Sequence, residues 1–174
     1  MKNFIQATLF VIVALVGGLM TSSCDPCEGT VCTDGYCSNG TCICYDGYEK
    51  SNNQCIPFNK EYTGENMQGI EVEDSKMLVP PSSKPVTYTI VASETDPLKI
   101  ILKDFNNLAG NDVTFTINSS KRNRLIEEGV ISKIGRFYKV SGFKEENEIK
   151  LTLIETQGPT FMQTFGQFNL TLQQ

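Results

Sequence analysis

The cysteines constrain this chain more strongly than any other feature. All seven lie between positions 24 and 55, and none follows. A cluster this dense is typical of a disulfide framework in an oxidising compartment rather than of thiols scattered through a core. The spacing alone does not select one pairing among the many that six cysteines allow. The six that stand close enough together to form one module are Cys27, Cys32, Cys37, Cys42, Cys44 and Cys55.

The cysteine-rich stretch needs crosslinks, because it has too few apolar side chains to form a core. Three bridges at about 2 to 4 kcal/mol each would supply the missing stability. The apolar residues of the stretch are Val31, Tyr36, Ile43, Tyr45, Tyr48 and Ile56.

The end of this stretch carries a specific motif. Cys42 and Cys44 are followed by Gly47, the aromatic Tyr48 and, after six intervening residues, Cys55. This pattern resembles the C-x-C-x-x-G-aromatic ending of epidermal-growth-factor-like (EGF-like) modules. The resemblance implies three disulfides, which join Cys27 to Cys37, Cys32 to Cys42 and Cys44 to Cys55.

Metal binding is the alternative use of such cysteines. Zinc sites often recruit histidine, but this chain has no histidine, and a secretory leader precedes the cluster. EGF-like modules that bind calcium carry an acidic run before their first cysteine, where this chain has only Asp25 and Pro26 after Cys24. We therefore expect disulfides, no metal and no cofactor.

Residues 1–23 have the features of a signal peptide. Lys2 precedes an apolar run from Ala7 to Met20, which is too short to span a bilayer comfortably, and small residues follow this run. We expect the leader to be removed during export to the cell envelope.

The seventh cysteine, Cys24, is left over if the other six pair. Ser22-Ser23-Cys24 resembles the end of a bacterial lipobox, in which the cysteine is acylated, for example with palmitate, and becomes the mature N-terminus. Cleavage after Ser23 by ordinary signal peptidase is the alternative, and the odd cysteine count favours lipidation. The resemblance implies a lipid-anchored protein of the outer membrane or cell surface, with the membrane as a partner through Cys24.

Charge and length bound the rest of the chain. The mature protein carries 14 basic against 20 acidic residues, a balance that argues against nucleic acid as a partner. Residues 24–57 comprise the anchor cysteine and the EGF-like module. Residues 58–174 are numerous enough for one domain with its own core.

The domain from 58 to 174 reads as all-β. Stretch 64–83 is acidic and rich in turn residues, and Pro80-Pro81-Ser82-Ser83 predicts a break before the first clear strand. Arg124 to Glu128 has some helical character, but its β-rich surroundings argue against a helix. The segments with strand patterns are 86–92, 98–103, 113–117, 136–141, 149–153 and 168–172.

Sequential hairpins of this kind must protect their edges by closure or by stacking. The fold class we expect is therefore mainly β, with an antiparallel β-barrel, a bent meander or a sandwich of about eight strands. The segment Tyr88–Asp96 runs into Lys99–Phe105, and Phe58 and Tyr62-Thr63-Gly64 precede it. These residues resemble the lipocalin-like or calycin-like domain that follows EGF-like modules in Bacteroidota-type lipoproteins.

Catalytic chemistry has little support in the sequence. The chain has no histidine and no G-x-S-x-G motif, so we expect no enzyme. Segment 121–144 has a net charge of +5 and segment 61–96 one of −5. These charges either neutralise each other on a mixed surface or leave a patch that binds an anionic partner such as a surface polysaccharide. The patch would comprise Arg122, Arg124 and Arg136.

Two functional hypotheses remain. The first is a non-catalytic lipid-anchored surface protein, whose EGF-like spacer displays the β-domain for protein or glycan binding. The second is a lipocalin-like carrier of a small apolar ligand. Seven phenylalanines would line the pocket of such a carrier, or else fill the core: Phe105, Phe115, Phe137, Phe143, Phe161, Phe165 and Phe168.

Overall fold

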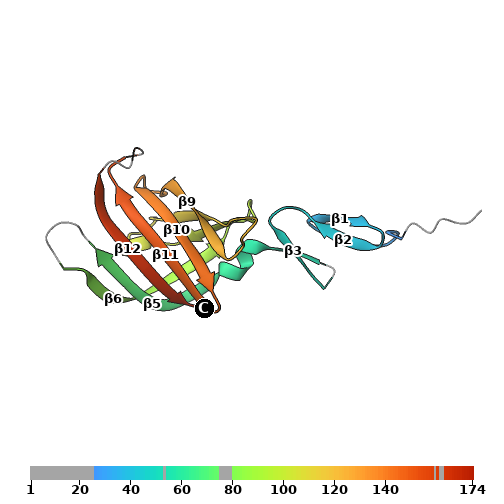
Figure 1. Cartoon of the computed structure of the whole chain (residues 1–174), viewed down its shortest axis with the longest axis horizontal. Coiled ribbons are helices and arrows are strands. Elements are labelled where there is room, and N and C mark those ends of the chain that lie inside the picture. The colour runs from blue at the N-terminus through green and yellow to red at the C-terminus, as the bar shows by residue number, and fades with distance from the viewer. Residues whose placement is uncertain (1–25, 53, 75–79, 159, 161–162) are drawn as a thin grey trace, which may run out of the picture.

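A computed structural model of the chain describes residues 26–52, 54–74, 80–158, 160 and 163–174. They form a small N-terminal module of two hairpins and one eight-stranded antiparallel sheet (Figure 1). The predicted signal peptide and Cys24 lie outside the described residues. Within the described ranges, no helix is both long and apolar enough to cross a membrane.

The module is built from short hairpins held by disulfides. Strand β1 (Gly35–Ser38) pairs with β2 (Thr41–Cys44), and β3 (Tyr48–Ser51) pairs with β4 (Gln54–Pro57). Asn39 and Gly40, which both have positive φ, form the two-residue turn of the first hairpin. The bridges are Cys27–Cys37, Cys32–Cys42 and Cys44–Cys55, the pairs that the EGF-like resemblance implies.

Strands β5 to β12 form the large sheet. Two 3-10 helices, η1 and η2, lie before β5 and between β7 and β8. The elements are η1 (Phe58–Tyr62), β5 (Gly64–Asp74), β6 (Ser82–Ala92), β7 (Lys99–Leu102), η2 (Phe105–Asn107), β8 (Val113–Thr116), β9 (Arg124–Ile131), β10 (Phe137–Glu145), β11 (Glu148–Thr156) and β12 (Thr164–Gln173).

The sheet curls into a nearly closed up-and-down barrel. Strands that are neighbours in the sheet are also neighbours along the chain, except that the first strand, β5, pairs with the last, β12. Between β8 and β9 the barrel is joined by a single bridge from Ile117 to Leu125. Closure removes nearly all exposed edges, so the structure selects the barrel over the sandwich.

Alternation along the strands places one apolar face inside the barrel. On β11 the side chains of Ile149, Leu151 and Leu153 are buried, whereas those of Lys150 and Thr152 between them are partly exposed. The same period of two holds for β12, as expected for strands with one wet face.

Phe105 of η2 fills the middle of the barrel. Its side chain is fully buried, and its ring centroid lies 5.2 Å from that of Phe168, 5.7 Å from that of Tyr138 and 5.9 Å from that of Tyr88. The side-chain amide of Asn111 holds the η2 segment by donating to the backbone oxygen of Phe105 at 3.0 Å. The η2 segment thus inserts a ring into the core.

One carboxylate lies among these apolar side chains. Glu71 on β5 is fully buried, accepts a hydrogen bond from the Tyr88 hydroxyl at 2.8 Å and lies 2.8 Å from the ammonium nitrogen of Lys84. Burial, together with the bond to Glu71, raises the pKa of Tyr88 above its ordinary value. Tyr88 therefore stays a neutral donor to Glu71 over the physiological pH range.

Two sequence predictions need correction, and the doubt about a helix at 124–128 is confirmed. The acidic stretch 64–83, expected to be turns, contains the eleven-residue strand β5, and β6 begins within the predicted break, at Ser82. Arg124 to Glu128 lies in strand β9, as its surroundings suggested. The strand β5 is fixed by pairing on both sides, with β12 and with β6, rather than by its own apolar pattern.

Candidate functional site

The module and the barrel meet at a junction fixed by backbone hydrogen bonds. The N–H of Phe58 donates to the oxygen of Gly47 at 2.9 Å, and the N–H of Asn59 donates to the oxygen of Pro97 at 3.0 Å. Gly47 has a φ of +88°, and a Cβ there would lie 2.8 Å from Cγ of Pro97. A glycine at position 47 is therefore required for close packing against the barrel.

Buried Asn59 ties the barrel side of this junction together. Its side-chain amide donates to the backbone oxygens of Ser93 at 3.1 Å, Asp96 at 3.0 Å and Lys99 at 3.2 Å. The loop between β6 and β7 is thereby held in place beneath the module.

Arg122 adds an electrostatic link across the junction. Its guanidinium pairs with Glu49 of the module and lies 3.7 Å from Glu61 of η1. The hydroxyl of Tyr62 donates to the backbone oxygen of Arg122 at 2.6 Å, which positions this arginine. The hydrogen bond to Glu49 is the main cause of a raised pKa of Arg122, and Glu61 raises it further.

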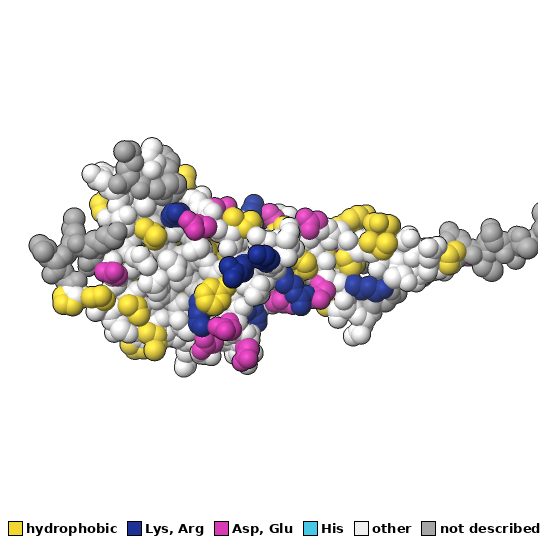
Figure 2. Space-filling view, viewed as in Figure 1, with side chains coloured by type: hydrophobic (Ala, Val, Ile, Leu, Met, Phe, Trp, Pro, Cys, Tyr) yellow, Lys and Arg dark blue, Asp and Glu magenta, His cyan; other side chains and the backbone are white. Residues whose placement is uncertain are grey.

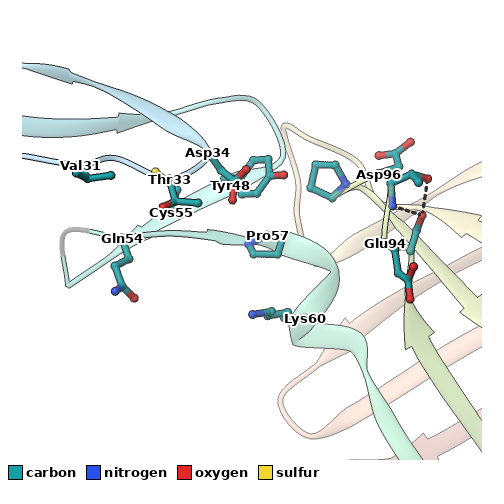
Figure 3. Close-up of a pocket in the computed structure, with 13 residues that line it drawn as sticks. Val31, Thr33, Asp34, Tyr48, Gln54, Cys55, Pro57, Lys60, Glu94 and Asp96 are labelled. Atoms are coloured by element: carbon teal, nitrogen blue, oxygen red, sulfur yellow. Dashed lines mark hydrogen bonds between the residues drawn. The ribbon is translucent and has the colours of Figure 1, made fainter.

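A cleft of about 460 Å³ opens at this junction (Figure 3). Asp34 and Tyr48 of the module lie on one side of it and Glu94 and Asp96 of the barrel on the other, Gln54 points away from these two carboxylates, and Lys60 projects from η1 (Figure 3). The full lining is Val31, Thr33, Asp34, Tyr48, Gln54, Cys55, Pro57, Lys60, Ser93, Glu94, Thr95, Asp96 and Pro97.

Some of the polar groups of this cleft are engaged in holding its walls. Burial alone would raise the pKa of Asp96, but the N–H of Leu98, which donates to it at 2.9 Å, and the ammonium of Lys99, at 3.1 Å, lower it on balance. Partial burial and the neighbouring Asp34 raise the pKa of Tyr48. We therefore interpret the cleft as part of the contact between module and barrel that orients the module.

We predict that Arg122→Ala loosens the junction without unfolding either unit. The Arg122 and Glu49 side chains are 44% and 46% exposed, so solvent screens the pair and the free energy of unfolding should fall by less than about 1 kcal/mol. The amides of Phe58 and Asn59, which carry the two junction hydrogen bonds, should exchange faster with solvent deuterium.

Arg124→Ala is the matched control for this experiment, because Arg124 lies two residues away on the barrel and makes no contact with the module among the described residues. Hydrogen exchange at Phe58 and Asn59 should match the wild type in this control. Unchanged exchange in Arg122→Ala as well would contradict the role given to Arg122.

The three arginines of the predicted anionic-partner patch do not form one cluster, because Arg136 is separated from Arg122 and Arg124 by the length of β9. Arg122 is at the junction, and Arg136 lies in the turn after the opposite end of β9, 2.8 Å from Glu155. Both are paired with carboxylates. Arg124, at the start of β9, has no ion pair with any described residue.

A second hollow contains Arg124. It has a volume of about 470 Å³ and lies on the outside of the barrel across β9, β10 and β11. The sequence patterns gave no sign that these strands form a groove. Its lining residues are Asn123, Arg124, Leu125, Glu127, Ser141, Gly142, Phe143, Lys150 and Thr152.

The phenylalanines proposed to line a ligand pocket differ in how deeply they are buried. Phe105, Phe115 and Phe168 are buried in the core, where they pack against other side chains. Phe143 and Phe165 are 42% and 48% exposed. Phe137 is half-buried at the start of β10, and Phe161 lies outside the described residues. The packed interior favours core filling over a ligand pocket.

The remaining predictions concern metal ligands and the bonding of the cysteines. In the ranges that the structure describes, no three histidine, cysteine, aspartate or glutamate residues are grouped as metal ligands. The six bridged cysteines are consumed by disulfides. Searches with the whole chain match no protein-family profile, no curated protein and no solved structure.

Proposed function

We propose that this chain is a non-catalytic, lipid-anchored protein of the outer membrane or cell surface, in which the EGF-like module holds the barrel away from the membrane for binding. The observation that carries the proposal is the fixed junction between the two units. A disulfide-closed module stands between the N-terminal end of the described chain and the barrel (Figure 1).

The anchor follows from the position of Cys24, two residues before the first described residue, Pro26. Each methylene of an acyl chain contributes about 0.8 kcal/mol to membrane binding. Stable anchoring needs about two membrane-binding groups, for example two acyl chains. Several acyl chains on one cysteine meet this requirement. The module then serves as a spacer directly at the bilayer surface.

The three disulfides support an extracytoplasmic location, because such bridges persist in oxidising compartments. The lack of histidine supports a binding rather than a catalytic role, since histidine is the commonest general base. The partner in this proposal is a protein or a glycan that the barrel meets outside the cell.

We predict that Cys24→Ser releases the protein from membranes. In a host labelled with radioactive palmitate, the wild-type chain should carry label and sediment with the membrane fraction, whereas Cys24→Ser should be unlabelled and soluble. Ser23→Ala, which changes the neighbouring position but keeps the cysteine, is the control and should behave like the wild type. Membrane retention of Cys24→Ser after removal of residues 1–23, which the mass of the protein shows, would overturn the proposed anchor.

A further inference from the structure

We propose that the groove containing Arg124 binds a glycan that carries carboxylate-bearing sugars. The groove comprises the nine lining residues given above, of which Asn123 directly precedes β9 and the other eight lie on strands β9, β10 and β11. This inference rests on the proposed display function, because it specifies what the displayed barrel would bind.

The shape of the groove follows from small residues between long ones. Ser141 and Thr152 are opposite each other on β10 and β11, and their short side chains face outward. Gly142 lies between them and the core: a Cβ there would point inward, 2.5 Å from the backbone oxygen of Lys150 and 3.1 Å from side-chain atoms of the buried Leu125 and Leu151, so only glycine fits. The β9–β10 pairing has a bulge next to Gly142, and a bulge bends the strand locally.

An exposed aromatic ring lies at the side of this groove. Phe143 is directly opposite Arg124 on β9 and Lys150 on β11, which places the three side chains in one row across neighbouring strands. The ammonium of Lys150 lies 5.4 Å from the centroid of the ring, and Phe143 is still 42% exposed. A sugar ring has an apolar C–H face that can pack on such an aromatic surface.

The charges around the groove single out Arg124. Lys150 is paired with Glu145 at 2.9 Å and Glu148 at 3.3 Å, and Glu127 is paired with Lys139. Arg124 forms no ion pair within the described parts of the chain. Its guanidinium is therefore available for a carboxylate, which it can bind with two parallel hydrogen bonds.

Uncharged polar groups continue from the groove over the adjoining strands. Thr152 donates to Oδ1 of Asn169 on β12 at 3.0 Å, and the amide of Gln167 donates to the same oxygen at 3.4 Å. In Figure 2 much of this side of the barrel has the white of the backbone and of side chains that are neither charged nor hydrophobic. Hydroxyl and amide groups of this kind suit the many hydroxyls of a sugar chain.

A protein partner fits this surface less well. Stable protein interfaces contain an apolar, aromatic-rich centre, and each partner buries about 800 Å². The groove instead offers one aromatic ring, hydroxyls and a single unpaired cation. Its volume lies in the range of about 300 to 1,000 Å³ that is usual for small-ligand clefts.

The test uses the full mature chain with Cys24→Ser, so that binding is measured in solution and independently of anchoring. The probes are oligogalacturonate, oligoalginate and hyaluronan fragments, with the methyl ester of oligogalacturonate as an uncharged counterpart. Calorimetry should detect binding of at least one acidic probe, and binding should weaken as salt is raised. Arg124→Gln should weaken it by about 10-fold to 100-fold, the effect of losing a charged hydrogen bond.

Phe143→Ala should abolish binding of both the acid and its ester, whereas Arg124→Gln should leave the ester unaffected. Two variants outside the groove should bind like the parent chain: Phe165→Ala, which also removes an exposed phenylalanine, and Arg136→Gln, which removes a paired arginine. Binding of no acidic probe, or equal binding by Arg124→Gln, would overturn the inference. Either result leaves the anchor proposal standing, because membrane release of Cys24→Ser is measured separately.

Discussion

Phe105→Ala should lower the free energy of unfolding of the barrel by about 3 to 5 kcal/mol, the range for removing a fully buried aromatic ring. Phe105 is completely buried, and its ring contacts those of Tyr88, Tyr138 and Phe168 from three sides. The barrel wall should resist collapse around the missing ring, because seven pairs of neighbouring strands and the Ile117–Leu125 bridge hold it. Most of the cavity should therefore remain.

Urea denaturation of the mature protein, followed by far-ultraviolet circular dichroism, measures this effect. Phe165→Ala is the control, because that phenylalanine is 48% exposed on β12, and its loss should change stability by about 0.5 kcal/mol or less. The decrease in the free energy of unfolding for Phe105→Leu should lie between those for Phe105→Ala and Phe165→Ala. An effect of Phe105→Ala no larger than that of the control would show that η2 does not fill the core.

The double variant Cys44→Ala, Cys55→Ala should destabilise the module by about 2 to 4 kcal/mol and leave the barrel folded. This bridge joins strand β2 of the first hairpin to strand β4 of the second. The module has almost no apolar core that could compensate for the loss of this bridge. The barrel contains no cysteine, so its core loses no contact.

Hydrogen exchange distinguishes the two units in this experiment. Amides of β1 to β4 and the junction amide of Phe58 should lose protection in the variant, whereas those of β11 and β12 should keep it. The control is Cys27→Ala, Cys37→Ala, which removes the bridge next to the N-terminal end and should leave protection at Phe58 intact. Equal loss of protection in the barrel would mean that module and barrel unfold as one cooperative unit.

The sequence was most informative where one physical pattern dominated. Alternation of apolar with polar residues predicted the strands at 149–153 and 168–172, because each has one face in the core and one in water. The eight-stranded antiparallel architecture followed from the sequential hairpins, although the choice of barrel over sandwich needed the pairing of β5 with β12.

Strand β5 shows why parts of the fold were not predicted from the sequence. Its inward-facing positions include Gly69 and Glu71, neither of which signals a buried strand. Glu71 is acceptable inside only because Tyr88 and Lys84 partner it from β6. Gly69 is required because a Cβ there would lie 2.0 Å from the backbone oxygen of Thr171 on β12. Both reasons depend on residues distant in the chain.

The candidate site residues were likewise only partly predictable from the sequence. The basic segment 121–144 suggested one patch, but strand β9 separates Arg122 from Arg136, and each has a carboxylate partner from another part of the fold. Of the three predicted arginines, only Arg124 has no ion pair among the described residues. The groove beside it depends on the cross-strand placement of Phe143 and the small Ser141 and Thr152, which local sequence does not reveal.

The most direct test of the display proposal is the intact mass of the mature protein extracted from its host membrane, before and after reduction. The proposal predicts a chain that starts at Cys24, carries the added mass of acyl groups and gains six hydrogen atoms on reduction, two for each of the three bridges. An unacylated N-terminus would contradict it. The protein would then be freely secreted, and a dimer linked through Cys24 would be the next species to seek.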